Sequence, residues 1–265
     1  MGPIFTTQVT KIKNNKKFET DDTVIREIKL DININGKRIV SLMATPTDLK
    51  ELSIGYLISE NIIEKVSDIT QFEITDIDTK IYKADIKATI NEASSDKLNT
   101  EGVIVSGCGR GASTHISLKS IEAKVMQDDF YIDANLLFKE MGEFYTQCPL
   151  YEQTGCVHTA KIHIDDSIYF IGEDIAQHNT IDKAVGKALL AGHSVNRAFL
   201  MVSGRLSSEM VAKAVMHQIP ILASRTASTC RGVNIAAKFG LTLIGFVRGQ
   251  SMNIYRNPER IHVES

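Results

Sequence analysis

The sequence predicts an α/β protein with a small β-rich N-terminal part and a larger C-terminal part in which helices and strands alternate. In the N-terminal part, apolar and polar residues alternate strictly over 28–34 and again over 82–90, which is typical of half-buried strands. In the C-terminal part, helical periodicity and short apolar runs follow one another, which favours a sheet with parallel strands covered by helices. A polar segment at 91–101 separates the two patterns, so we expect a β-rich subdomain over 1–101 and an α/β domain over 102–265.

The N-terminal part begins with about 23 polar, lysine-rich residues that we expect to be loosely ordered. Asn35-Gly36 is a strong turn signal, and it predicts a hairpin between the strand at 28–34 and a returning strand at 37–44. Asp48 precedes an apolar helical pattern and has Glu51 three residues later, so we expect Asp48 to cap this helix.

In the C-terminal part, Asp133 predicts the start of a helix, and Asp165-Asp166 predicts the turn of a hairpin. The elements expected after this hairpin are a helix ending near Gly192, a strand at 199–202, a helix containing Met210 to Val215, a strand at 221–223, a helix ending at Gly240 and a strand at 241–246. In open α/β sheets, ligands bind beyond the carboxyl ends of the strands. The segments that follow these strands are therefore the first candidates for a site.

Composition excludes several classes of protein. The chain has 265 residues, a net charge of −2 and 43% hydrophobic residues, so it shows no basic footprint for nucleic acid. The chain has no run of eighteen apolar residues, so no membrane span is predicted. The N-terminus lacks the apolar core of a signal peptide. Four widely spaced cysteines fit a reducing compartment, so we expect a soluble, cytoplasmic protein. Cys148 and Cys230 are expected to be structural, because free cysteines are commonly buried.

Residues 103–113 form a glycine-rich segment, VIVSGCGRGAS, whose pattern indicates a reactive cysteine. Cys108 lies between two glycines, so no bulky neighbour shields its sulfur. The adjacent guanidinium of Arg110 favours the thiolate, which is the nucleophilic form. The alternative is a glycine turn that holds a small, inert cysteine. The loop alone does not decide between the two.

Three segments after predicted strands combine arginine with glycine or hydroxyl residues. They contain Ser203 and Arg205, then the run SRTAST at 224–229, and then the run at 246–251. Arginines and helix N-termini both bind phosphate, so together these segments favour a phosphate-bearing ligand, although each alone also fits an ordinary helix cap. Neither common nucleotide-binding fingerprint is present. The residues of the last run are Phe246, Val247, Arg248, Gly249, Gln250 and Ser251.

Two further clusters contain histidines beside carboxylates or a cysteine. Cys156 and His158 precede one strand, while Asp174 and His178 precede a helix whose first turns contain Asp182. The ligand spacings of zinc sites are absent, so no metal is expected. A cysteine hydrolase built from Cys108, His158 and Asp174 remains an alternative, because such triads are defined by arrangement in space.

Six segments, in order along almost the whole chain, resemble one known family. They read ATPTDLKELSIGYLISENII, SGCGRGAS, TGCVHTA, EDIAQHNTIDKAVG, VSGRLSSEMVAKA and LTLIGFVRGQSMNIY. This order resembles the formate dehydrogenase accessory sulfurtransferases, the FdhD family. The resemblance implies a C-terminal domain similar to cytidine deaminases and a homodimer. It also implies a sulfur carrier between a cysteine desulfurase and the molybdenum bis(molybdopterin guanine dinucleotide) cofactor, before that cofactor enters formate dehydrogenase.

Position by position, the resemblance assigns the persulfide to Cys108 and the cofactor-binding loop to 246–251, where GDP-like nucleotides are expected to mimic the cofactor. Ser203 and Arg205 are expected to add to this site, and the supporting candidates are Arg110, Cys156, His158, Asp174, His178 and Asp182. Two departures from the family pattern stand out: many members have a second loop cysteine where this chain has Gly111, and the usual Gly-Arg is Ala176-Gln177. The first departure keeps open an alternative, a cofactor-binding chaperone without sulfur chemistry.

Overall fold

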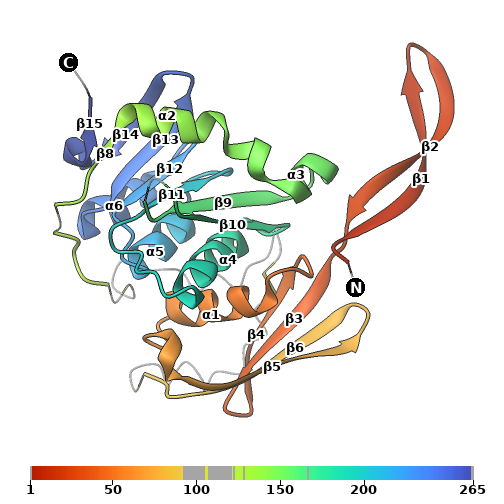
Figure 1. Ribbon diagram of the computed structural model, residues 1–265, viewed down its shortest axis with the longest axis horizontal. Helices are drawn as coiled ribbons and strands as arrows, with labels where there is room; N and C mark the ends of the chain where they lie inside the picture. The colour runs from red at the N-terminus through yellow and green to blue at the C-terminus, as the bar shows by residue number, and fades with distance from the viewer. Residues whose placement is uncertain are drawn as a thin grey trace.

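A computed structural model describes residues 2–91, 105–106, 121, 123–127, 129–165 and 167–263. It confirms a mixed α/β architecture built around a six-stranded and a five-stranded sheet (Figure 1). The six-stranded sheet has the order β10-β9-β11-β12-β13-β14. Its strands are β9 (His158–His163), β10 (Tyr169–Asp174), β11 (Phe199–Val202), β12 (Ile221–Ser224), β13 (Thr242–Arg248) and β14 (Ser251–Arg256).

Strand directions in this sheet place one set of strand ends at a common edge. β11, β12 and β13 are parallel, while β9 is antiparallel to both β10 and β11. β10 therefore runs in the same direction as β11 to β13. The carboxyl ends of these four strands and the first residue of β9 lie along one edge of the sheet, which we call the carboxyl edge. The predicted boundaries of β11 are confirmed to the residue.

Both faces of the six-stranded sheet are covered at its central strands, as the alternate residues of β11 show. Leu200 and Val202 pack with α4 (Gln177–Leu190), α5 (Ser208–Met216) and α6 (Cys230–Phe239). Phe199 and Met201 pack on the opposite face with α2 (Ala134–Gly142). Asp133 caps α2 as predicted, since its side chain accepts a hydrogen bond from the Asn135 N–H.

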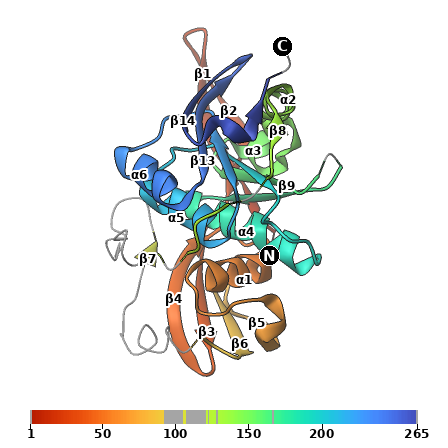
Figure 2. The ribbon, with the colours of Figure 1, turned by 90° about the vertical axis from the view of Figure 1, so that its left-hand side faces the viewer.

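The five-stranded sheet has the order β5-β6-β3-β4-β7. Its strands are β3 (Ile28–Ile34), β4 (Lys37–Ala44), β5 (Ile69–Asp78), β6 (Ile81–Ala88) and β7 (Val105–Ser106). The Asn35-Gly36 hairpin is confirmed, with φ values of 50° and 84°. β7 extends this sheet beyond the predicted boundary at residue 101. Helix α1 (Leu49–Ser59) lies between the sheet and α4 (Figure 2).

Two N-terminal expectations are wrong. Residues 4–25 are not loosely ordered but form a paired ribbon of β1 (Ile4–Lys13) and β2 (Lys16–Ile25), closed by Asn14 and Asn15 with φ of 52° and 58°. Asparagine tolerates this left-handed turn, which sequence reasoning overlooked. Asp48 makes no side-chain cap on α1, because its carboxylate lies 2.8 Å from Lys187 Nζ instead.

Helices α1 and α4 cross so closely that their backbones lie against each other at two glycines. A Cβ atom placed on Gly55 would lie 2.1 Å from the carbonyl oxygen of Asp182, and one on Gly186 would lie 2.1 Å from that of Glu51. Only glycine allows this approach. The N-terminal layer is therefore fixed directly against the helix that follows β10.

The remaining short elements connect these layers. They are η1 (Val66–Asp68), β8 (Ile132–Asp133), η4 (Phe144–Gln147), α3 (Pro149–Thr154), η5 (Pro258–Arg260) and β15 (Ile261–His262). No helix in the part of the chain that the structure describes is long and apolar enough to cross a membrane.

Candidate functional site

The three predicted anion-binding segments meet at the carboxyl edge. The Ser224 hydroxyl donates to the Gly204 carbonyl at 2.7 Å, which joins the loop after β12 to the loop after β11. The Phe246 N–H donates to the Thr226 carbonyl at 3.0 Å, and Arg248 Nε donates to the Arg225 carbonyl at 3.1 Å. The loops after β11 and β12 and the last residues of β13 therefore form one continuous surface, and the predicted strand over 241–246 extends to Arg248.

His158 begins β9 on the same edge, beside Ser203. Its Nδ1 lies 3.3 Å from the Ser203 hydroxyl oxygen, which also accepts a hydrogen bond from the Thr159 N–H at 3.0 Å. Burial lowers the pKa of His158, and the charges of His178 and Arg205 act in the same direction. His158 is therefore a neutral imidazole at neutral pH, able to donate at one nitrogen and accept at the other.

The start of α4 contributes a second polar pair to this edge. His178 Nε2 lies 2.7 Å from Glu209 Oε2 on α5, and this contact lowers the pKa of Glu209. The neighbouring Gln177 donates through Nε2 to the Arg205 carbonyl at 2.8 Å. Gln177 therefore fixes the backbone of the loop after β11.

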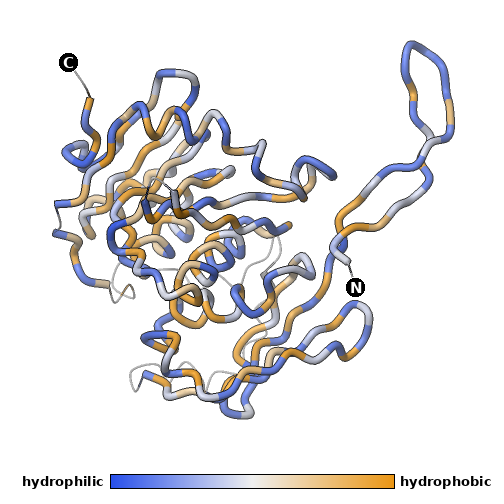
Figure 3. The backbone as a smooth tube through the Cα atoms, viewed as in Figure 1, coloured by the Kyte–Doolittle hydropathy of each residue, from blue (hydrophilic) through white to orange (hydrophobic). Residues whose placement is uncertain are grey.

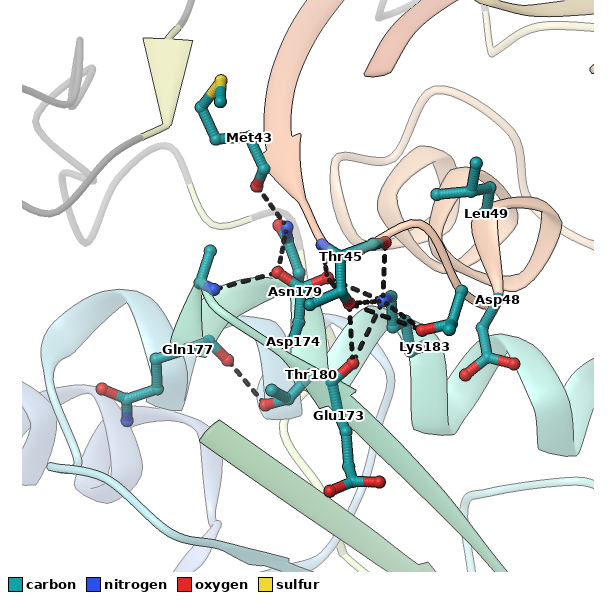
Figure 4. A network of polar contacts seen from close by, with 12 residues as sticks. Met43, Thr45, Asp48, Leu49, Glu173, Asp174, Gln177, Asn179, Thr180 and Lys183 are labelled. Carbon is teal, nitrogen blue, oxygen red and sulfur yellow. Dashed lines mark hydrogen bonds and ion pairs between the residues drawn. The ribbon is translucent and has the colours of Figure 1, made fainter. Parts of the chain in front are cut away.

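Asp174 belongs to a buried network and not to an exposed triad (Figure 4). Its Oδ2 lies 2.7 Å from Lys183 Nζ and accepts from the Thr45 N–H at 3.0 Å, and both side chains of the ion pair are fully buried. Its Oδ1 accepts from the Ala176 N–H at 2.9 Å and from Asn179 Nδ2 at 3.0 Å. Both carboxylate oxygens are thus occupied.

The hydrolase alternative with Asp174 as the orienting acid is not supported by this geometry. His158 makes its side-chain contact with Ser203, and Asp174 instead ties β10 and α4 to the end of β4. Lys183 completes that tie, because its Nζ donates to the Thr45 hydroxyl at 2.7 Å. Thr45 and Lys183 were not singled out from the sequence as site residues. The sequence HNTIDK is typical of a helix, but nothing in it indicates that the end of β4 packs against Lys183.

Asp182 lies away from the carboxyl edge, inside the packing of α1, α4 and α5. Its carboxylate is 2.7 Å from Lys213 Nζ and accepts from the Ser59 hydroxyl at 3.1 Å. Burial alone would raise the pKa of Asp182, but the Lys213 ammonium and His217 outweigh it and hold the pKa below its ordinary value. Asp182 therefore connects helices and is not available to a ligand at the edge.

The segment 246–251 divides into exposed and buried residues. Phe246 adopts a left-handed conformation with φ of 53° and is 37% exposed, whereas Val247 is 1% exposed and belongs to the core under α2. Arg248, Gly249, Gln250 and Ser251 are exposed. A ligand at this loop can meet five of the six residues predicted, but not the side chain of Val247.

The cysteines differ in environment. Cys108 and Arg110 lie outside the described residues; β7, the described strand nearest to them in sequence, ends at Ser106. Cys148 is buried, its thiol donates to the Phe144 carbonyl, and burial raises its pKa to about 11, so it is inert at neutral pH as expected. Cys156 is exposed just before His158. Cys230 begins α6 at the carboxyl edge and is exposed, so the burial that suggested a structural role for it is not present.

A model of the FdhD/NarQ family matches residues 25–262 of the chain. The chain belongs to the FdhD/NarQ family. Among its relatives, a sulfur carrier protein FdhD from Wolinella succinogenes is 37% identical over 93% of this chain and 85% of its own length. One of the same name from Bacillus subtilis is 31% identical over 96% of this chain and 98% of its own length.

A solved structure has the same fold. It is that of a protein from Desulfotalea psychrophila assigned as a formate dehydrogenase accessory protein, with a TM-score of 0.79 and 25% identity. The match covers 98% of this chain and 100% of that one. The FdhD resemblance drawn from the six segments is thereby confirmed. Within the described residues, no three His, Cys, Asp or Glu side chains are grouped closely enough to hold a metal ion.

Proposed function

We propose that this FdhD-family protein is a sulfurtransferase that carries sulfane sulfur on Cys108 from a cysteine desulfurase to the molybdenum bis(molybdopterin guanine dinucleotide) cofactor of formate dehydrogenase. The single observation that carries the proposal is the family membership, since the curated relatives are named sulfur carrier proteins. The reaction is proposed to take place in the cytoplasm, and the protein is proposed to act as a homodimer.

The capture step needs one thiolate and no oxidant. The Cys108 thiolate attacks the terminal sulfur of the desulfurase persulfide, the sulfur–sulfur bond of the donor breaks, and the donor cysteine leaves as a thiolate. A new sulfur–sulfur bond forms on Cys108. One sulfane sulfur has moved, and the oxidation states at the start and at the end are the same. A single cysteine suffices, so Gly111 in place of a second loop cysteine is compatible with the step.

The carboxyl edge is proposed to hold the phosphate-bearing tails of the cofactor. Arg205 and Arg248 are exposed at its surface, and helices α4, α5 and α6 begin there with their N–H groups and positive dipole ends. Phe246 presents an exposed ring beside Arg248, whose guanidinium carbon lies 5.5 Å from the ring centroid. A cation and an aromatic face together suit a guanine dinucleotide.

Formate dehydrogenase activity tests the sulfur step against the chaperone alternative. In cells that lack their own copy of this protein, Cys108→Ser is expected to abolish formate dehydrogenase activity, because the serine hydroxyl cannot form a persulfide. Cys230→Ser, which changes another exposed cysteine in the same way, is the matched control and is expected to retain activity. Full activity of Cys108→Ser would favour a cofactor-binding chaperone.

Nucleotide binding tests the proposed cofactor surface. GDP is expected to raise the melting temperature of the protein, as any ligand of the native state does. Arg248→Ala is expected to weaken GDP binding by about 10-fold or more, since a charge-assisted contact is worth about 1.5–3 kcal/mol. Arg256→Ala removes the same charge from β14, where Arg256 pairs with Leu243 near the opposite end of β13, and should leave binding unchanged. Equal losses in the two variants, measured by calorimetry, would contradict the assignment.

A further inference from the structure

The loop after β11, residues 203–205, offers backbone donors at the carboxyl edge, where hydrophilic residues follow the hydrophobic strands of the sheet (Figure 3). Its Gly204 carbonyl accepts from the Ser224 hydroxyl at 2.7 Å, and its Arg205 carbonyl accepts from Gln177 Nε2 at 2.8 Å. Because a trans peptide points its N–H away from its carbonyl, the Arg205 N–H faces away from Ser224. The N–H groups of Gly204 and Arg205 have no acceptor among the residues that the structure describes. They are therefore donors that a ligand at this edge is able to use.

His158 lies beside this loop and contacts it through one ring nitrogen. Its Nδ1 is 3.3 Å from the Ser203 hydroxyl oxygen, and that oxygen already accepts from the Thr159 N–H at 3.0 Å. Apart from His158 Nδ1, the Ser203 hydroxyl has no acceptor in the part of the chain that the structure describes. The proton of the hydroxyl is therefore available to Nδ1.

The Ser203 hydroxyl selects one tautomer of His158. A neutral imidazole carries a proton on one nitrogen and accepts at the other, and the hydrogen bond at one nitrogen decides the state of the second. When Ser203 donates to Nδ1, both groups are satisfied and the ring proton lies on Nε2. The opposite tautomer, with the proton on Nδ1, leaves the Ser203 hydroxyl proton without an acceptor. The hydrogen bonds therefore favour the Nε2–H form.

The ring of His158 is not needed to hold β9 to β11. These strands already pair along their length, with Val202 opposite Ala160, and the Ser203 N–H adds a bond to the Thr159 carbonyl at 2.9 Å. The side chain of His158 is half-buried. Its Nε2 has no partner among the described residues and is not one of the buried atoms that lack a partner. Nε2 is therefore open to a ligand.

We infer that His158 donates through Nε2–H to a phosphate oxygen of the ligand, and that Ser203 is the positioning residue that holds His158 in this tautomer. The inference rests on the proposed function, because it names a further group that meets the anion at the carboxyl edge. The exposed Arg205 and Arg248 supply charge there, whereas His158 and the loop N–H groups supply uncharged donors of fixed direction. Donors that are already oriented need little reorganisation when an anion binds.

Calorimetric titration with GDP tests the donor. His158→Asn ends its side chain near the place of Nδ1 and removes the donor at Nε2, so GDP binding is expected to weaken by about 10-fold or more. His158→Gln brings an amide N–H to the place of Nε2 and is expected to bind GDP within about three-fold of the unmodified chain. His193→Asn, beyond the far end of α4, is the matched control and should bind GDP unchanged.

The outcomes of this titration separate the inference from the proposed function. Equal weakening in His158→Asn and His158→Gln, or no weakening in either, would overturn the inference and leave the cofactor surface in place. Absence of GDP binding by the unmodified chain would overturn the proposed cofactor surface together with the inference.

Nitrogen-15 NMR of the imidazole rings tests the role of Ser203 without any ligand. The protonated and bare nitrogens of a neutral ring resonate far apart, and the signals of His158 are those missing from the spectrum of His158→Gln. At neutral pH the unmodified chain is expected to carry the proton on Nε2. Ser203→Ala is expected to show both tautomers and to weaken GDP binding by about three-fold or more, whereas Ser203→Thr keeps the hydroxyl and the tautomer. A proton on Nδ1 in the unmodified chain, or an unchanged tautomer in Ser203→Ala, would overturn the inference.

Discussion

Lys183→Met is expected to lower the free energy of unfolding by about 3–5 kcal/mol. Both side chains of the Asp174–Lys183 pair are fully buried, with Nζ and Oδ2 2.7 Å apart. Methionine fills a similar volume but supplies no charge, so the Asp174 carboxylate would be left in the interior without its counter-ion. Lys183 also donates to the Thr45 hydroxyl and to the Glu173 carbonyl, and both acceptors would lose that donor.

The matched control is Lys187→Met, one helical turn further along α4. Lys187 pairs with Asp48 at 2.8 Å, but the side chains of both are 29% exposed, so solvent screens the pair and its loss is expected to cost about 1 kcal/mol or less. Urea denaturation followed by circular dichroism compares the two variants. Equal destabilisation would mean that the buried network of Asp174 does not hold β4 against α4.

Gly55→Ala is expected to destabilise the protein by about 3 kcal/mol or more. The added Cβ would lie 2.1 Å from the Asp182 carbonyl oxygen, and the atoms nearest to it belong to the backbone of α4. No flexible side chain can move aside, so α1 and α4 must separate. Separation would also stretch the contact of Ser59 with Asp182, which lies in the same interface.

Gly142→Ala is the control for Gly55→Ala. Gly142 ends α2, and no atom lies within 4 Å of the position that a Cβ on it would take, so alanine there is expected to be neutral or to stabilise by up to about 1 kcal/mol through helix propensity. Thermal unfolding of both variants measures the difference. A Gly55→Ala protein as stable as Gly142→Ala would contradict the close crossing of the two helices.

Local patterns in the sequence predict much of the C-terminal fold. The apolar run at 199–202 gives β11 without error, and Gly240 ends α6 in the left-handed conformation expected of a helix stop. The loops after β11 and β12 and the end of β13 could be placed together because parallel neighbouring strands end at one edge. These features depend on nearby residues or on a general rule of sheet topology.

Features that depend on distant residues were not predictable in the same way. Asp48 and Glu51 form a capping pattern, yet Asp48 pairs with Lys187, which lies 139 positions later. Asp174 suggested a catalytic acid, but its oxygens are taken by Thr45, Asn179 and Lys183. Strand β5 was not predicted, and the ribbon of β1 and β2 was missed because most of its residues are polar. The role of Cys108 remains a prediction from the family resemblance.

Intact-mass spectrometry tests that role most directly. After incubation with a cysteine desulfurase and cysteine, the unmodified chain is expected to gain about 32 Da, the mass of one sulfur atom, and Cys230→Ser is expected to gain the same. Cys108→Ser is expected to show no gain. A gain of one sulfur on Cys108→Ser equal to that on the unmodified chain would contradict the assignment of Cys108 as the sulfur carrier.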